Sequence, residues 1–140
     1  MLQVFRVEHE STQLGPFQTP DDFTQTLAKR AAATRDLRVP GEDGLPLGYL
    51  PFKFVFGCGD LAALKRWFCL GGTDVENEEI IQELKRRGFR LLEFLVEEGD
   101  YRVGLSGLQV AFDPSLSREE SLFQAHDLAT LLAYPAALAH

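Results

Sequence analysis

The sequence has little of what marks a secreted, membrane-spanning or nucleic-acid-binding protein. Its two cysteines, Cys58 and Cys69, have the spacing of neither a CxxC metal pair nor a disulfide framework. No apolar run approaches the roughly 20 residues that span a bilayer, and the first residues lack the basic-then-apolar pattern of a secretion signal. Lysine and arginine number 14 against 21 acidic residues, and the resulting formal charge of −7 repels a phosphate backbone. We therefore expect a protein of a reducing cytoplasm that binds neither membranes nor nucleic acid directly.

Short catalytic signatures are missing as well. The chain holds no P-loop, no GxGxxG, no HExxH and no GxSxG motif. Its three histidines stand in no recognisable motif, and His9, flanked by Glu8 and Glu10, lacks the spacing of a metal site. The sequence therefore gives no support to most of the enzyme classes that carry a short signature. The leading interpretation therefore has no metal and no cofactor.

What the sequence does contain is enough apolar material for one hydrophobic core. The chain has 140 residues, 45% of them apolar and 11% aromatic, near the usual size of one domain. Residues 89–114 read as a hairpin that continues into a further strand, and capping signals predict helices over 19–33, 60–68, 73–88 and 117–134. The prediction is a single α+β domain over 1–140, with a mixed, mainly antiparallel sheet of about five strands and roughly three or four helices against it. Residues 35–51, rich in proline and glycine, read as a long ordered loop.

The stretch 56–68, FGCGDLAALKRWF, passes from an apolar strand through a Gly-Cys-Gly turn into a helix. A thiol before a helix can be an activated nucleophile. We expect Cys58 instead to be a small buried filler in a tight turn that Gly57 and Gly59 permit. Trp67, the only tryptophan, falls beside the apolar face of the helix and is expected in the core rather than on a ligand platform.

Three blocks of the sequence resemble recurring segments of a group of small, uncharacterised bacteriophage and prophage proteins. The blocks are VFRVEHESTQLGPF, FVFGCGDLAALKRWF and GFRLLEFLVEEGDYRVGLSGLQVAFD. The resemblance covers about residues 2–113 and leaves an extra C-terminal helix, about 117–134, outside the pattern. It implies an accessory factor that acts on host machinery, a role that includes inhibition of CRISPR and other defence systems.

The most conspicuous surface feature is acidic. The candidate partner-binding residues lie on the expected hairpin and on the helix before it: Glu93, Glu97, Glu98, Asp100, Glu76 and Glu79. Such acids can simply form a solvated face. They can also occupy the basic nucleic-acid groove of a host protein, because opposite charge accelerates association. The leading hypothesis is therefore a phage-encoded interaction protein that binds and inhibits a host protein in the host cytoplasm, through an acidic surface.

The alternative hypothesis is enzymatic. Arg6 on the first strand and Gln109 on a late strand are similar to the layout of ADP-ribosyltransferases, which implies an arginine that holds NAD and a late-strand carboxylate that orients the ribose. Gln109 is not a carboxylate, and Arg6 can also be an edge-strand residue or a surface partner of Glu8. A divergent transferase that uses NAD would modify an excess of its target, whereas an inhibitor would act stoichiometrically.

Overall fold

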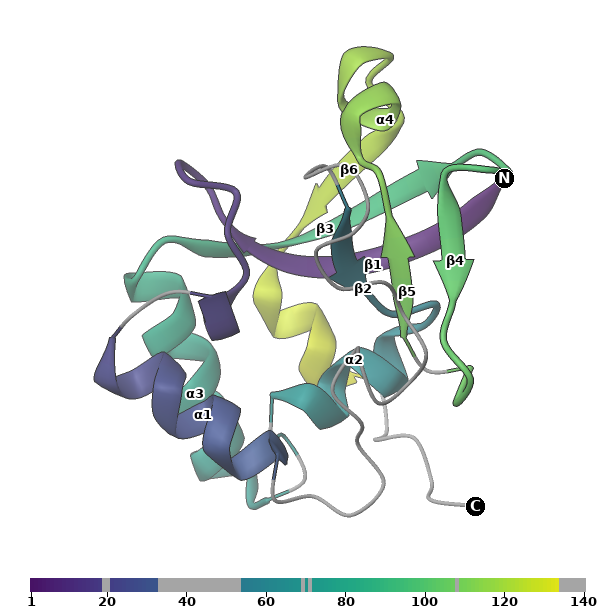
Figure 1. Cartoon of the computed structure of the whole chain (residues 1–140). Helices are drawn as coiled ribbons and strands as arrows, with labels where there is room; N and C mark the ends of the chain where they lie inside the picture. The colour runs from purple at the N-terminus through teal and green to yellow at the C-terminus, as the bar shows by residue number, and fades with distance from the viewer. Residues whose placement is uncertain (19–20, 33–53, 69, 71, 108, 134–140) are drawn as a thin grey trace.

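The strands of the protein form two antiparallel sheets of three strands each (Figure 1). In this computed structural model the described residues are 1–18, 21–32, 54–68, 70, 72–107 and 109–133. The first sheet is ordered β1-β3-β6, with β1 (Leu2–His9), β3 (Phe89–Val96) and β6 (Phe123–His126). The second is ordered β2-β5-β4, with β2 (Val55–Gly57), β5 (Val110–Phe112) and β4 (Tyr101–Val103).

Helices cover both sides of the first sheet. The helical segments are α1 (Asp22–Ala32), α2 (Leu61–Trp67), α3 (Asp74–Arg86), α4 (Ser115–Glu119) and the 3-10 turns η1 (Pro16–Gln18) and η2 (Leu128–Ala133). Figure 1 shows α1, α2, α3 and η2 on one side of β1 and β3, with α4 on the other side. None of the helices in the described ranges is long and apolar enough to cross a membrane.

Local capping explains where two of the helices begin. The carboxylate of Asp60 accepts a hydrogen bond from the backbone N–H of Ala63 at 2.7 Å, which caps α2. The hydroxyl of Thr73 accepts from the N–H of Glu76 at 3.2 Å and caps α3. Just after α3, Gly88 has a φ of +89°, the left-handed conformation that commonly ends a helix. The predicted starts of these helices are therefore confirmed. Of the first predicted helix, 19–33, residues 19, 20 and 33 lie outside the described residues.

The core has two parts, one on each face of the first sheet. Phe5 and Val7 of β1 pack against the helices, whereas Val4 points to the opposite face and joins the cluster under the second sheet. In that second cluster the rings of Phe94 and Phe112 lie 5.2 Å apart. Because successive side chains of a strand alternate between faces, β1 is buried on both sides.

Among the described residues, one backbone bridge joins the two sheets. Phe5 N–H donates to the carbonyl of Cys58 at 2.8 Å, and Cys58 N–H donates back to the carbonyl of Phe5 at 2.9 Å. Gly57 makes this approach possible, because a Cβ there would lie 2.5 Å from the Phe5 carbonyl oxygen. The Gly-Cys-Gly segment is therefore the joint between the sheets as well as the turn into α2.

The α+β class and the single domain are confirmed, but the strand arrangement differs from the prediction. A single mixed sheet was expected, and the described strands form two sheets with antiparallel pairing throughout. The expected pairing within residues 89–103 is wrong, since β4 pairs with β5 and not with β3. The physical reason is that β1 and β6 already occupy both edges of β3. The chain therefore crosses from the first sheet to the second at the turn 97–100.

The expected C-terminal helix over 117–134 is also wrong. The short helix α4 ends at Glu119, and Ser121 then adopts a left-handed φ of +57°. The following residues add β6 to the first sheet and form η2. Leu128 and Leu131 are buried, as their apolar character predicts, but they belong to the 3-10 turn η2 and not to an α-helix. The predicted loop at 35–51 lies outside the described residues.

Candidate functional site

The acidic residues predicted to bind a partner lie in separate places. We call Glu97, Glu98 and Asp100 the acidic turn, since they occupy the connection between β3 and β4. The N–H of Asp100 donates to the carbonyl of Glu97 at 3.1 Å, and Gly99 between them has a φ of +92°. The side chains of Glu97 and Glu98 are exposed. The turn thus presents carboxylates on a short, hydrogen-bonded backbone.

Glu76 and Glu79 are exposed on α3, away from the acidic turn. Helix α3 leads into the first residue of β3, whereas the acidic turn follows its last residue, and Figure 1 shows them at opposite ends of that strand. A strand of eight residues is about 26 Å long. Glu93, on β3 itself, has its Oε1 3.0 Å from Nε2 of His126 and is already engaged. The six predicted acids therefore do not form one patch.

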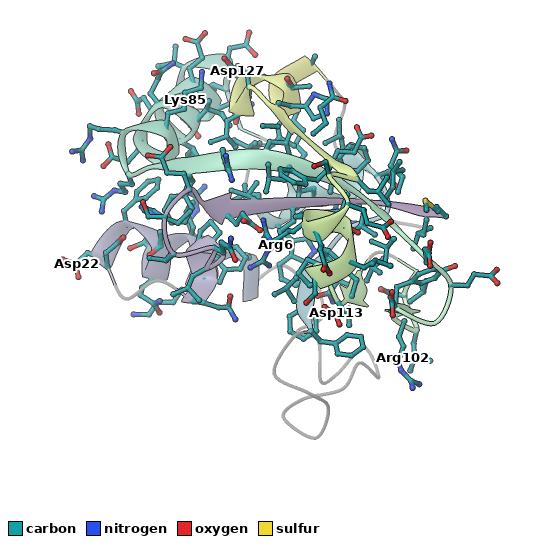
Figure 2. The ribbon with its side chains drawn as sticks, turned by 90° about the horizontal axis from the view of Figure 1, so that it is seen from above. Arg6, Asp22, Lys85, Arg102, Asp113 and Asp127 are labelled. Atoms are coloured by element: carbon teal, nitrogen blue, oxygen red, sulfur yellow. The ribbon has the colours of Figure 1, made fainter. Side chains whose placement is uncertain are left out.

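Many of the described basic side chains are paired with acids inside the molecule. Bases in these ion pairs are Arg6, Lys85, Arg86, Arg87 and Arg118. Figure 2 shows one such pair, Lys85 of α3 beside Asp127. The Nζ atom of Lys85 lies 2.7 Å from Oδ1 of Asp127. Within the part of the chain that the structure describes, no ion pair involves Glu97 or Glu98. Glu97 and Glu98 of the acidic turn therefore form no ion pair with any base that the structure describes.

The two residues of the enzymatic hypothesis, Arg6 and Gln109, line one cavity of about 320 Å³. This volume is at the lower end of the range for small-molecule sites. Its walls come from β1, the η1 turn, Gly57, Cys58 and α2, and several lining side chains are aromatic: Phe17, Phe56, Trp67 and Phe68. None of the described residues that line it carries a carboxylate. Arg6 and Gln109 therefore do line the same cavity, but no described lining residue supplies the carboxylate that a transferase would use.

Arg6 is held firmly in the wall of this cavity, near the centre of the molecule in Figure 2. Its side chain is 5% exposed. Nε donates to the Glu8 carboxylate at 3.2 Å, Nη1 to the Phe56 carbonyl at 2.8 Å and Nη2 to the Gln13 carbonyl at 3.1 Å. Burial lowers the pKa of Arg6 below its ordinary value, and the neighbouring Glu8 carboxylate opposes that shift. The guanidinium is therefore a fixed, buried cation.

Glu8 is the centre of a buried ionic group that the sequence did not reveal. Its side chain is 0% exposed, and both of its oxygens accept hydrogen bonds from Nη2 of Arg118, at 2.7 and 2.8 Å. The Arg118 guanidinium also lies 5.1 Å from the centre of the Phe94 ring. Arg6 and Glu8, which were considered from the sequence as partners on the surface, do form an ion pair, but the pair is buried. The sequence signal was two charges alternating with apolar residues on a first strand.

Cys58 is a packing residue, as predicted. Its side chain is 2% exposed within the core cluster. Burial raises the pKa of the thiol, and the nearby Asp60 carboxylate raises it further, so the nucleophilic thiolate is disfavoured. Trp67 packs against the same cluster but is only partly buried, and it lines the cavity. Its expected core role is therefore combined with a place on the cavity wall.

One protein family model matches most of the chain. The family model described as Bacteriophage T4 Y00F protein matches residues 1–125, most of the 140 residues. The chain therefore belongs to this bacteriophage protein family, whose function is unknown, and the resemblance to small uncharacterised phage proteins is confirmed. The match extends beyond the predicted limit at residue 113, through α4 and into β6. No curated protein and no solved structure matches the chain.

Proposed function

We propose that this phage-family protein binds and blocks a host protein in the host cytoplasm, and that a CRISPR or other defence component is the kind of target it takes. The observation that supports this is the exposed acidic turn, where Glu97 and Glu98 have no ion-pair partner among the described residues while many of the bases are paired internally. An uncompensated acidic projection attracts a basic groove such as a nucleic-acid channel, and it raises the association rate.

The acidic turn is the contact that we assign within the larger acidic set. Glu93 is engaged with His126. Glu76 and Glu79 lie at the other end of β3 and form the solvated face of α3.

The experiment begins with the full chain as bait in a host lysate, and the captured protein is then purified. Association rates are measured for the parent chain and for Glu97→Lys with Glu98→Lys, at two salt concentrations. We expect at least a tenfold slower association for this variant at low salt, because the charge reversal removes the attraction to a basic groove. The association rate of the variant should also depend less on salt, because salt acts by screening that attraction, to about 10 Å at 0.1 M.

The matched control is Glu78→Lys with Glu79→Lys, which makes the same charge change on the exposed face of α3. Its association rate should stay close to that of the parent chain. An equal loss for both variants would show a general charge effect without a contact at the acidic turn. Unchanged rates for the turn variant would refute the proposal.

The alternative proposal, an ADP-ribosyltransferase-like enzyme that uses NAD, is supported by one observation: Arg6 and Gln109 line the same cavity. The assay is transfer of labelled ADP-ribose from NAD to an excess of the captured target. Inhibition at one-to-one stoichiometry without NAD supports the binding function, whereas labelling of many target molecules for each molecule of the chain supports the enzyme.

A further inference from the structure

We propose that the cavity beside Arg6 binds a small molecule with an aromatic or compact apolar body and a single carboxylate. The inference concerns the interior of the molecule and is independent of the acidic turn. It rests on three features of the cavity: apolar walls, the remaining N–H groups of Arg6 and an excess of positive charge.

The walls define the body of the ligand. Phe17 and Phe68 are stacked with their ring centres 5.5 Å apart, and the ring centres of Phe17 and Trp67 are 6.2 Å apart, so three neighbouring aromatic side chains line the cavity. Leu64 and Val7 add aliphatic area. Flat apolar groups gain most from such a surface, through burial and ring stacking. The volume of about 320 Å³ suits a compact molecule more than a dinucleotide.

Arg6 defines the polar end. A guanidinium carries five N–H groups, and the three hydrogen bonds of Arg6 to Glu8, Phe56 and Gln13 leave one N–H on each terminal nitrogen. When a ligand displaces water from the cavity, an N–H group without a partner costs free energy, and an acceptor on that ligand removes this cost. The cavity therefore favours a ligand that accepts hydrogen bonds.

Charge selects an anion among the possible acceptors. Arg6 and Arg118 share the single carboxylate of Glu8, so these three side chains together carry one net positive charge, with Arg6 and Glu8 buried and Arg118 partly exposed. The described lining residues add no carboxylate. A carboxylate would meet an arginine that is already oriented, and charge-assisted hydrogen bonds are about twice as strong as neutral ones.

Gly15 leaves the space that such a carboxylate would use. A Cβ at this position would lie 3.6 Å from Nη1 and 3.7 Å from Nη2 of Arg6, and 3.7 Å from Oε1 of Gln18, all of them ordinary contact distances. The missing side chain therefore leaves room beside both terminal nitrogens, and a larger side chain there would fill it without a clash at Cβ. This makes Gly15 a means of closing the site while Arg6 stays in place.

The test uses the fluorescence of Trp67, the only tryptophan in the chain. The full-length protein is titrated with benzoate and with cyclohexanecarboxylate, and in parallel with their neutral amides, which have nearly the same shape. We expect both carboxylates to change the fluorescence saturably at millimolar or lower concentration, and to bind about tenfold more tightly than the amides. Calorimetry with the same four compounds provides a readout that does not depend on fluorescence.

Variants separate the cavity from other sites. Gly15→Val should weaken carboxylate binding by about tenfold or more, with a melting temperature close to the parent value. Gly59→Val is the matched control, because Gly59 is exposed and a Cβ there meets nothing within 4 Å. It should bind as the parent does. Equal affinity for acids and amides, no response to either acid, or unchanged binding in Gly15→Val would each overturn the proposal.

Discussion

Arg118 on α4 donates to both carboxylate oxygens of Glu8 on β1, at 2.7 and 2.8 Å, although 110 positions separate the two residues. Glu8 also accepts from Arg6 at 3.2 Å. A fully buried carboxylate is stable only when it is paired and hydrogen-bonded. The pair thus links the segment after β5 to the first strand and fixes α4 over the sheet.

Removal of this pairing should destabilise the protein in a graded way. Glu8→Ala leaves two arginines without their shared partner and should lower the free energy of unfolding by about 3–5 kcal/mol. Arg118→Ala should cost less, about 1.5–3 kcal/mol, because Arg6 still pairs with Glu8. The neighbouring exposed residue provides the control, since Glu119→Ala should change stability by about 0.5 kcal/mol or less. Urea unfolding measures all three, and equal stability of the Arg118 and Glu119 variants would contradict a structural role for the pair.

Features that depend on neighbouring residues were predictable from the sequence. The caps at Asp60 and Thr73 and the glycine after α3 act over a few residues, and the helices begin where these signals stand. Burial of Cys58 followed from its place between an apolar strand and an amphipathic helix. Pairing depends on the whole chain. That β4 joins β5 follows from the occupation of both edges of β3, which no local pattern reports.

The C-terminal segment shows the same limit. The apolar residues between 122 and 132 have helical spacing, but a strand followed by a 3-10 turn buries Leu128 and Leu131 equally well. The free edge of β3 decides between the two, because it offers backbone hydrogen bonds to β6. Likewise, Arg6 and Glu8 were visible as an unusual pair, but their burial requires Arg118 from far along the chain.

Gly57→Ala should disrupt the joint between the sheets. The new Cβ would lie 2.5 Å from the Phe5 carbonyl oxygen and 2.8 Å from Cγ1 of Val4, so the strands must separate. We expect a loss of about 1–3 kcal/mol, the usual cost of overpacking, together with faster hydrogen exchange at the Cys58 amide. Gly59→Ala, two residues away in open space, should be nearly neutral. If exchange at Cys58 is unaffected by the Gly57 variant, the bridge does not hold the sheets together.

Cys58 should resist alkylation as long as the protein is folded. Burial raises the pKa of its thiol, so at neutral or mildly alkaline pH the group remains protonated and out of reach. Iodoacetamide followed by peptide mapping resolves Cys58 from Cys69. We expect no label on Cys58 in buffer and complete label in urea. Rapid labelling of Cys58 under native conditions would show an accessible thiolate and would restore the nucleophile hypothesis.

Asp21 should make the stability of the first helix depend on pH. Its carboxylate accepts from the N–H of Thr24 at 2.8 Å, and Oδ1 lies 3.3 Å from Nη1 of Arg87 beyond the end of α3. Burial acts to raise the pKa of Asp21, but the hydrogen bonds from Thr24 and the charge of Arg87 outweigh it, and the pKa is lowered overall. A lowered pKa in the folded state means that the stabilisation is present above the unfolded pKa, about 3.9, and is lost as the pH falls through the lower folded value.

At neutral pH we expect Asp21→Ala to cost about 1 kcal/mol, the usual value of a lost cap. Asp21→Asn should cost less, because an amide can still cap the helix but cannot pair with Arg87. In acid the carboxyl of the parent is protonated, so its advantage over Asp21→Asn should vanish. Urea unfolding of the three proteins at neutral pH and over an acid series that extends below the lowered folded pKa of Asp21 measures these differences. An advantage over Asp21→Asn that persists undiminished in acid would mean that charge on Asp21 contributes nothing to the contact between α1 and α3.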